Sequence, residues 1–72
     1  MKRFTIYMRA GGLMEDPEFH WERHGFSAGL DAKEACMNLF KNDNLFDHKT
    51  MTYWGWLLGY ENEDGGITVI KP

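Results

Sequence analysis

The chain has 72 residues and a net charge of −3, and 43% of its residues are hydrophobic and 15% are aromatic. A chain of this length holds one domain, residues 1–72, and its hydrophobic content excludes the class of chains that stay disordered. The acidic balance, eleven Asp and Glu against eight Lys and Arg, argues against nucleic-acid binding, in which phosphate contacts supply most of the affinity.

The chain has a single cysteine, Cys36, so no disulfide forms within it and a reducing compartment is expected. Its N-terminal residues alternate between apolar and polar types, unlike the continuous apolar run of a signal peptide. No segment reaches the roughly 18 apolar residues of a membrane helix. We therefore expect a soluble, cytoplasmic protein.

Residues 3–9 are predicted to form the first strand. Phe4, Ile6 and Met8 occupy every second position, which is the period typical of a half-buried strand. Gly11-Gly12 then indicates a turn.

The segment after this turn admits two interpretations. Residues 16–25 begin with Asp-Pro and end with Gly, which are the start and stop signals of a short helix. The alternative is a strand over residues 19–28, in which Trp21 and Phe26 have opposite parity, and a change of parity across residues 23–25 requires a bulge. We favour the strand, because it gives the first strand an antiparallel neighbour.

Residues 31–42 carry the clearest helical pattern. Asp31 is a good N-cap with Glu34 three residues on, which resembles a capping box, and Leu30 is placed to staple onto Ala35. An apolar stripe at a spacing of three and four residues follows, made of Ala32, Ala35, Cys36, Leu39 and Phe40. The helix therefore has one apolar face.

The second half of the chain is predicted to consist of strands. Leu45-Phe46 fold back to cap the core after the helix. Residues 51–61 are rich in aromatic residues and contain glycines, which favours a strand over a helix. A polar loop over residues 61–66 and a last strand over residues 67–70 complete a hairpin.

The order of the elements is strand, strand, helix, strand, strand. It predicts an α+β fold, a two-layer sandwich in which one main helix covers one face of an antiparallel sheet of three or four strands. A helix of about 12 residues is only about 18 Å long, so it leaves the other face of the sheet open.

The strand over residues 51–61 decides what the open face carries. If Tyr53 and Leu57 face the helix, the residues of the other parity face outward, with Tyr7 beside them. The candidate partner-binding residues are then Trp54, Trp56, Leu58, Tyr60 and Tyr7, because a contiguous aromatic patch usually marks an interface. If the parity is reversed, the large residues of this strand fill the core instead.

No catalytic or metal site is predicted. His20 and His24 would lie about 13 Å apart on a strand, too far to share a metal ion, and Cys36 on the apolar stripe resembles a small buried hydrophobe. We expect no cofactor and no small-molecule substrate, because a chain this short leaves little room for a pocket.

These features predict a small non-enzymatic interaction module of the regulator or inhibitor type. Its aromatic sheet face would dock onto a second copy of itself, as a homodimer, or onto another protein. The alternative is a module for single-stranded nucleic acid, in which the sheet aromatics stack on bases while Arg3, Arg9 and Arg23 contact phosphates. No membrane contact is expected.

Overall fold

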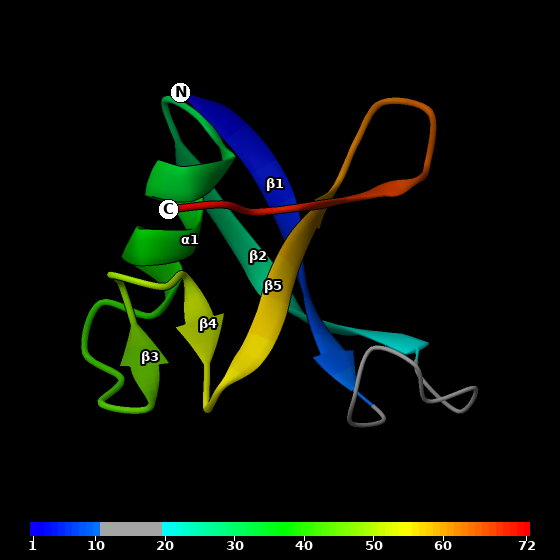
Figure 1. Ribbon diagram of the computed structural model, residues 1–72. Coiled ribbons are helices and arrows are strands. Elements are labelled where there is room, and N and C mark those ends of the chain that lie inside the picture. Colours follow the sequence, from blue (N-terminus) through cyan, green and yellow to red (C-terminus); the bar gives the residue numbers. More distant parts are fainter. Residues whose placement is uncertain (11–19) are drawn as a thin grey trace.

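The computed structural model describes residues 1–10 and 20–72 (Figure 1). Residues 11–19, with the predicted turn at Gly11-Gly12, lie outside the described part of the chain. The elements in chain order are β1 (Lys2–Ala10), β2 (His20–Gly29), α1 (Ala32–Leu39), β3 (Phe46–Asp47), β4 (Thr52–Tyr53), β5 (Trp56–Glu61) and β6 (Ile67–Val69).

The strands form one antiparallel sheet with the order β2-β1-β5-β4-β3, and β6 pairs with the last part of β5. α1 packs mainly on β2. The predicted α+β class, single helix and antiparallel sheet are confirmed for the described residues. The predicted number of three or four strands is wrong, because these residues form six. Residues 51–61 bend into β4 and β5, and the short β3 pairs with β4.

β2 is the strand that the sequence favoured over the alternative helix. Ile6 pairs with Gly25 whereas Tyr7 pairs with Arg23, so His24 has no opposite residue in β1. This extra residue is the bulge that the change of parity required.

The bulge determines which side chains of β2 face the helix. A Cβ added at Gly25 would lie 3.4 Å from a side-chain atom of Leu39 in α1, so Gly25 faces the helix. Because side chains alternate along a strand, Phe26 faces the opposite side. Trp21, which pairs with Arg9, faces that side as well.

α1 begins at the predicted N-cap and ends before residue 42. The carboxylate of Asp31 accepts a hydrogen bond from the N–H of Glu34 at 2.8 Å, and the carboxylate of Glu34 accepts one from the N–H of Leu30 at 3.1 Å. The predicted staple of Leu30 onto Ala35 is wrong, because Leu30 is 71% exposed. Gly29 occupies the space beside Ala35 instead, where an added Cβ would lie 2.5 Å from the Ala35 nitrogen.

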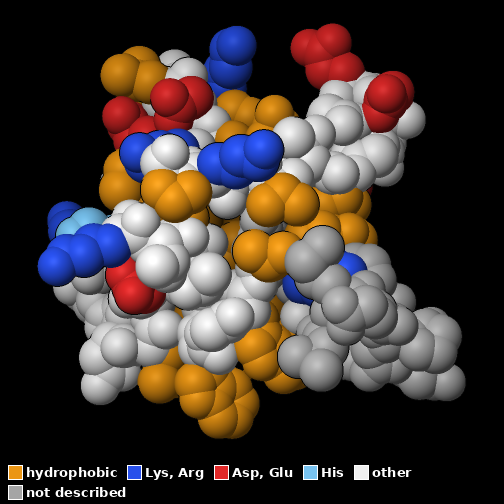
Figure 2. All heavy atoms as spheres, viewed as in Figure 1, with side chains coloured by type: hydrophobic (Ala, Val, Ile, Leu, Met, Phe, Trp, Pro, Cys, Tyr) orange, Lys and Arg blue, Asp and Glu red, His pale blue; other side chains and the backbone are white. Residues whose placement is uncertain are grey.

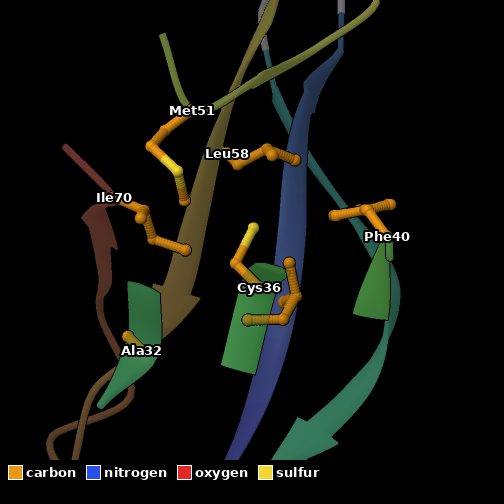
Figure 3. Packing of buried hydrophobic residues seen from close by; sticks show 7 residues of the cluster. Ala32, Cys36, Phe40, Met51, Leu58 and Ile70 are labelled. Carbon is orange, nitrogen blue, oxygen red and sulfur yellow. The ribbon is translucent and has the colours of Figure 1, made fainter. Parts of the chain in front are cut away.

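The core lies between α1 and the sheet (Figure 3). Its buried residues are Ile6, Ala32, Cys36, Phe40, Met51, Leu58 and Ile70. The N–H of Ile70 donates to the carbonyl of Leu58 at 2.8 Å, which draws the chain after β6 onto the core. Of the predicted fold-back pair, Phe46 stacks on Phe40 with ring centroids 5.2 Å apart, whereas Leu45 is exposed.

Gly29→Ala tests the close approach of β2 to α1. The added Cβ would lie 2.5 Å from the Ala35 nitrogen, and backbone cannot move aside as a flexible side chain can. We expect the free energy of unfolding, measured by urea denaturation, to fall by about 1–3 kcal/mol. Gly25→Ala in the same strand is the matched control, because its Cβ would meet only side-chain atoms of Leu39 at ordinary contact distances. Equal losses in the two variants would contradict this packing.

Candidate interaction surfaces

Residues 51–61 form a hairpin with an exposed aromatic tip. Tyr53 pairs with Trp56, and Trp54 and Gly55 between them have φ angles of 54° and 77°. Positive φ at both central positions is the geometry of a type I′ turn. Trp54 is 71% exposed, and its ring stacks on that of Trp56 with centroids 6.4 Å apart. We call Trp54 and Trp56 the tryptophan turn. Figure 2 shows hydrophobic side chains at the lower end of the molecule, where Figure 1 places the turn between β4 and β5.

Two members of the predicted partner-binding set, Leu58 and Tyr60, were predicted wrongly. Leu58 is fully buried in the core. Tyr60 pairs with Ile6 and packs edge-on against Phe4, with ring centroids 5.6 Å apart. Both residues face the helix, so neither belongs to an outward surface. In β5 the structure therefore has the reversed parity, in which Leu58 and Tyr60 pack on the core.

The sheet face turned away from α1 is called the outer face. Its composition follows from the register of four strands and from the alternation of side chains along each strand. It comprises Arg3, Thr5, Tyr7 and Arg9 of β1, Trp21, Arg23, Phe26 and Ala28 of β2, Leu57, Gly59 and Glu61 of β5, and Ile67 and Val69 of β6. The one helix among the described residues packs on the other face.

Trp21 and Phe26 are outer-face aromatics that the predicted set omitted. A Cβ added at Gly59 would lie 3.1 Å from Cη2 of Trp21, so the indole reaches across β1 and lies over this glycine of β5. Phe26 is 66% exposed, and the guanidinium carbon of Arg23 lies 5.5 Å from its ring centroid. The parity change near the bulge was the sequence signal that could have placed both aromatics on one face.

Tyr7 is the member of the predicted set that the structure places on the outer face. Its hydroxyl donates a hydrogen bond to Oε1 of Glu61 at 2.8 Å. This bond is the largest cause that raises the pKa of Tyr7 above its usual value, while the charge of Arg23 opposes it. The centre of the outer face therefore carries a carboxylate.

Charges on the outer face are divided between its two halves. Arg3, Arg9 and Arg23 lie on β1 and β2, whereas Glu61 lies on β5. The three arginines of the nucleic-acid alternative thus share a face with Tyr7. The tryptophan turn, whose rings that alternative also used, is not part of this face.

Two recesses open beside these strands. One of about 330 Å³ is lined by Arg3, Phe4, Thr5, Phe26, Ser27 and Ala28. The other, of about 630 Å³, is lined by Lys2, Arg3, Phe4, Tyr60, Glu61, Asn62 and Glu63. Both recesses are open to solvent, unlike a ligand pocket that encloses most of the surface of its ligand. Neither lining contains a histidine or a cysteine.

The two histidines considered as metal ligands have separate surroundings. Nε2 of His20 lies 3.2 Å from a carboxylate oxygen of Glu22, whereas the ring of His24 packs against those of Phe40 and Tyr53. Within residues 1–10 and 20–72, no group of three or more His, Cys, Asp or Glu could hold a metal ion.

Comparisons with protein-family models, with curated proteins and with solved structures find no match for this chain. No helix in the described part of the chain is long and apolar enough to cross a membrane. Function is therefore argued from the two surfaces, the tryptophan turn and the outer face.

The reactivity of Cys36 tests how tightly the core is closed. The thiol is free and fully buried, and burial raises its pKa from 9.0 to about 12. Only the thiolate reacts, so we expect negligible alkylation by iodoacetamide in the folded chain at about pH 8 and rapid alkylation in urea. The thiol loses its proton at a lower pH in the unfolded chain than in the folded chain. The free energy of unfolding should therefore fall as the pH rises above 9.0. Rapid alkylation without urea would contradict the burial.

Proposed function

We propose that this chain is a small non-enzymatic interaction module that docks an aromatic surface onto another protein or onto a second copy of itself. The observation that carries the proposal is the tryptophan turn, in which Trp54 is held outside the core at 71% exposure. Tryptophan is among the residue types most enriched at the energetic centres of protein interfaces.

The backbone of Trp54 supports a role beyond folding. A φ of 54° is in the left-handed region, which costs a residue with a side chain about 1–2 kcal/mol, and glycine or asparagine usually occupies this position of a type I′ turn. Met51 also has a positive φ, but its side chain is fully buried in the core. The N–H of Trp54 donates to the carbonyl of Leu45 at 2.8 Å, a bond that any residue but proline could make, and its ring stacks on that of Trp56. Backbone strain that packing does not explain is a mark of functional residues.

A second candidate, binding of single-stranded nucleic acid, is supported by the face that Arg3, Arg9 and Arg23 share with Tyr7. The Glu61 carboxylate bonded to Tyr7 and the net charge of −3 count against it. Titration with single-stranded oligonucleotides at low salt, followed by tryptophan fluorescence, measures this activity. Absence of quenching under these favourable conditions removes the candidate.

Trp54→Asn separates a docking residue from a structural one. Asparagine tolerates a positive φ, so relief of strain offsets the lost ring stack, and we expect the free energy of unfolding to stay within about 1 kcal/mol of that of the parent. Proteins captured from a lysate by the immobilised parent should be depleted at least roughly tenfold with the variant. Quantitative mass spectrometry of the captured proteins makes the comparison.

Leu30→Asn is the matched control. Leu30 is 71% exposed, as Trp54 is, but it precedes α1, which Figure 1 shows away from the turn between β4 and β5. Partners that the Leu30 variant keeps and the Trp54 variant loses support the proposal. If Trp54→Asn keeps every partner, or destabilises the chain by about 3 kcal/mol as a core truncation would, the tryptophan turn is structural and the proposal fails.

A further inference from the structure

The half of the outer face that β1 and β2 form carries cations on both sides of an aromatic ring. Three successive residue pairs lie along it: Arg3 with Ala28, Thr5 with Phe26, and Tyr7 with Arg23. We propose that these three pairs bind an extended acidic segment of a partner protein. Two carboxylates of the segment contact the arginines, and an apolar side chain between them contacts Phe26. This surface is separate from the tryptophan turn, so either proposal can fail alone.

Arg3 and Arg23 are available to an anion. Both side chains are exposed, and neither forms an ion pair with an acid of residues 1–10 or 20–72. The guanidinium carbon of Arg23 lies 5.5 Å from the ring centroid of Phe26. A guanidinium on an aromatic ring still presents N–H donors at its edge, which match the two oxygens of a carboxylate. Because the chain as a whole has a net charge of −3, this cationic half of one face is where an acidic partner is attracted.

The strand register sets the spacing of the charges that the partner must carry. Arg3 and Tyr7, the residue opposite Arg23, are four residues apart in β1, which is about 13 Å at about 3.3 Å per residue. An extended segment has the same rise, and every second side chain points to the same side. A segment that lies along β1 therefore presents its residues i, i+2 and i+4 to the three pairs. Acids at i and i+4 face the arginines, and an apolar residue at i+2 faces Phe26.

A recess gives this apolar side chain a place to enter. The recess of about 330 Å³ lies at the first two pairs, where the small side chains of Thr5 and Ala28 separate Arg3 from Phe26. Because it is open to solvent, it suits one side chain of a segment that passes over the face and not an enclosed small molecule. Phe26 is 66% exposed and forms an apolar wall. This contact matters, because exposed ion pairs alone contribute little to affinity.

Glu61 confines the segment to β1 and β2. It lies on β5, on the other side of β1 from β2, and its carboxylate accepts the hydrogen bond from the Tyr7 hydroxyl at 2.8 Å. An acid placed over β5 would meet this carboxylate, whereas an acid placed over β2 meets Arg23. A nucleic acid carries a charge at every nucleotide, and most of its phosphates would lie beyond the two arginines on an acidic chain. The charges therefore favour a short acidic segment over nucleic acid.

Synthetic peptides test the spacing. The probe is a fluorescein-labelled peptide with the central sequence Glu-Thr-Phe-Thr-Glu, in which threonine favours the extended conformation. The matched control, Glu-Thr-Phe-Glu-Thr, has the same composition and charge but turns one carboxylate to the opposite side of the extended segment. Fluorescence anisotropy at low salt should give a dissociation constant below about 500 µM for the probe. The control should bind at least about threefold more weakly.

Charge reversal tests the two contacts. Arg3→Glu and Arg23→Glu should each weaken binding of the probe at least about fivefold. Two further peptides carry lysine in place of the first or the last glutamate. One of them should restore binding to Arg3→Glu, and the other to Arg23→Glu, to within about twofold of the parent pair. Which peptide restores which variant gives the direction of the segment.

Lys33→Glu is the matched control for net charge. Lys33 is an exposed residue of α1, which packs on the opposite face of the sheet. This variant should bind the probe to within about twofold of the parent. Trp54→Asn should also leave binding intact, which separates this proposal from the proposed function.

Several outcomes would overturn the proposal. These are no saturable binding of the probe up to about 1 mM, equal binding of the probe and its control peptide, and a charge-reversal variant that neither lysine peptide restores. A loss in Lys33→Glu as large as that in Arg23→Glu would show attraction without a site. An oligonucleotide bound more tightly than the probe, or self-association that Arg23→Glu abolishes, would assign the face to nucleic acid or to a second copy.

Discussion

An unpaired residue in β2, His24, determines what each face of the sheet carries. Without it, regular alternation would place Trp21 and Phe26 on opposite faces. With it, Gly25 lies against α1 and both aromatics point away from the helix. The ring of His24 packs against aromatic rings at the end of α1 and in β4. His24, which breaks the alternation, thus also packs β2 against the end of α1 and against β4.

The molecule measures only 18 Å along its shortest dimension, which is the thickness of one helix packed on one sheet. Two glycines allow close packing, one on each face of the sheet. Gly29 brings β2 against the backbone of α1, and Gly59 leaves room for the Trp21 ring on the other face. A helix this short covers few positions, so the remaining apolar side chains lie on the outer face and at the tryptophan turn. A chain this small buries a smaller fraction of its surface on folding than a larger one, so part of its apolar content stays outside the core.

The features that were predicted correctly from the sequence depend on contacts between residues that are close together in the chain. Asp31 caps α1 through Glu34 within one turn, and Asn62 closes the hairpin between β5 and β6 through Gly66 at 2.8 Å. The turn at Trp54-Gly55 was missed because tryptophan stands where a type I′ turn usually has asparagine or glycine. The facing of β5 follows from its register with β1, a pairing of distant segments that alternation within one strand does not specify.

The two surfaces have different physical origins. The tryptophan turn is local and strained, whereas the outer face arises from strand register alone. The turn depends mainly on the close pairing of Tyr53 with Trp56, whereas the outer face depends on pairings between segments that are far apart in the chain. A substitution in the turn therefore leaves the outer face in place, and the two surfaces can be varied separately.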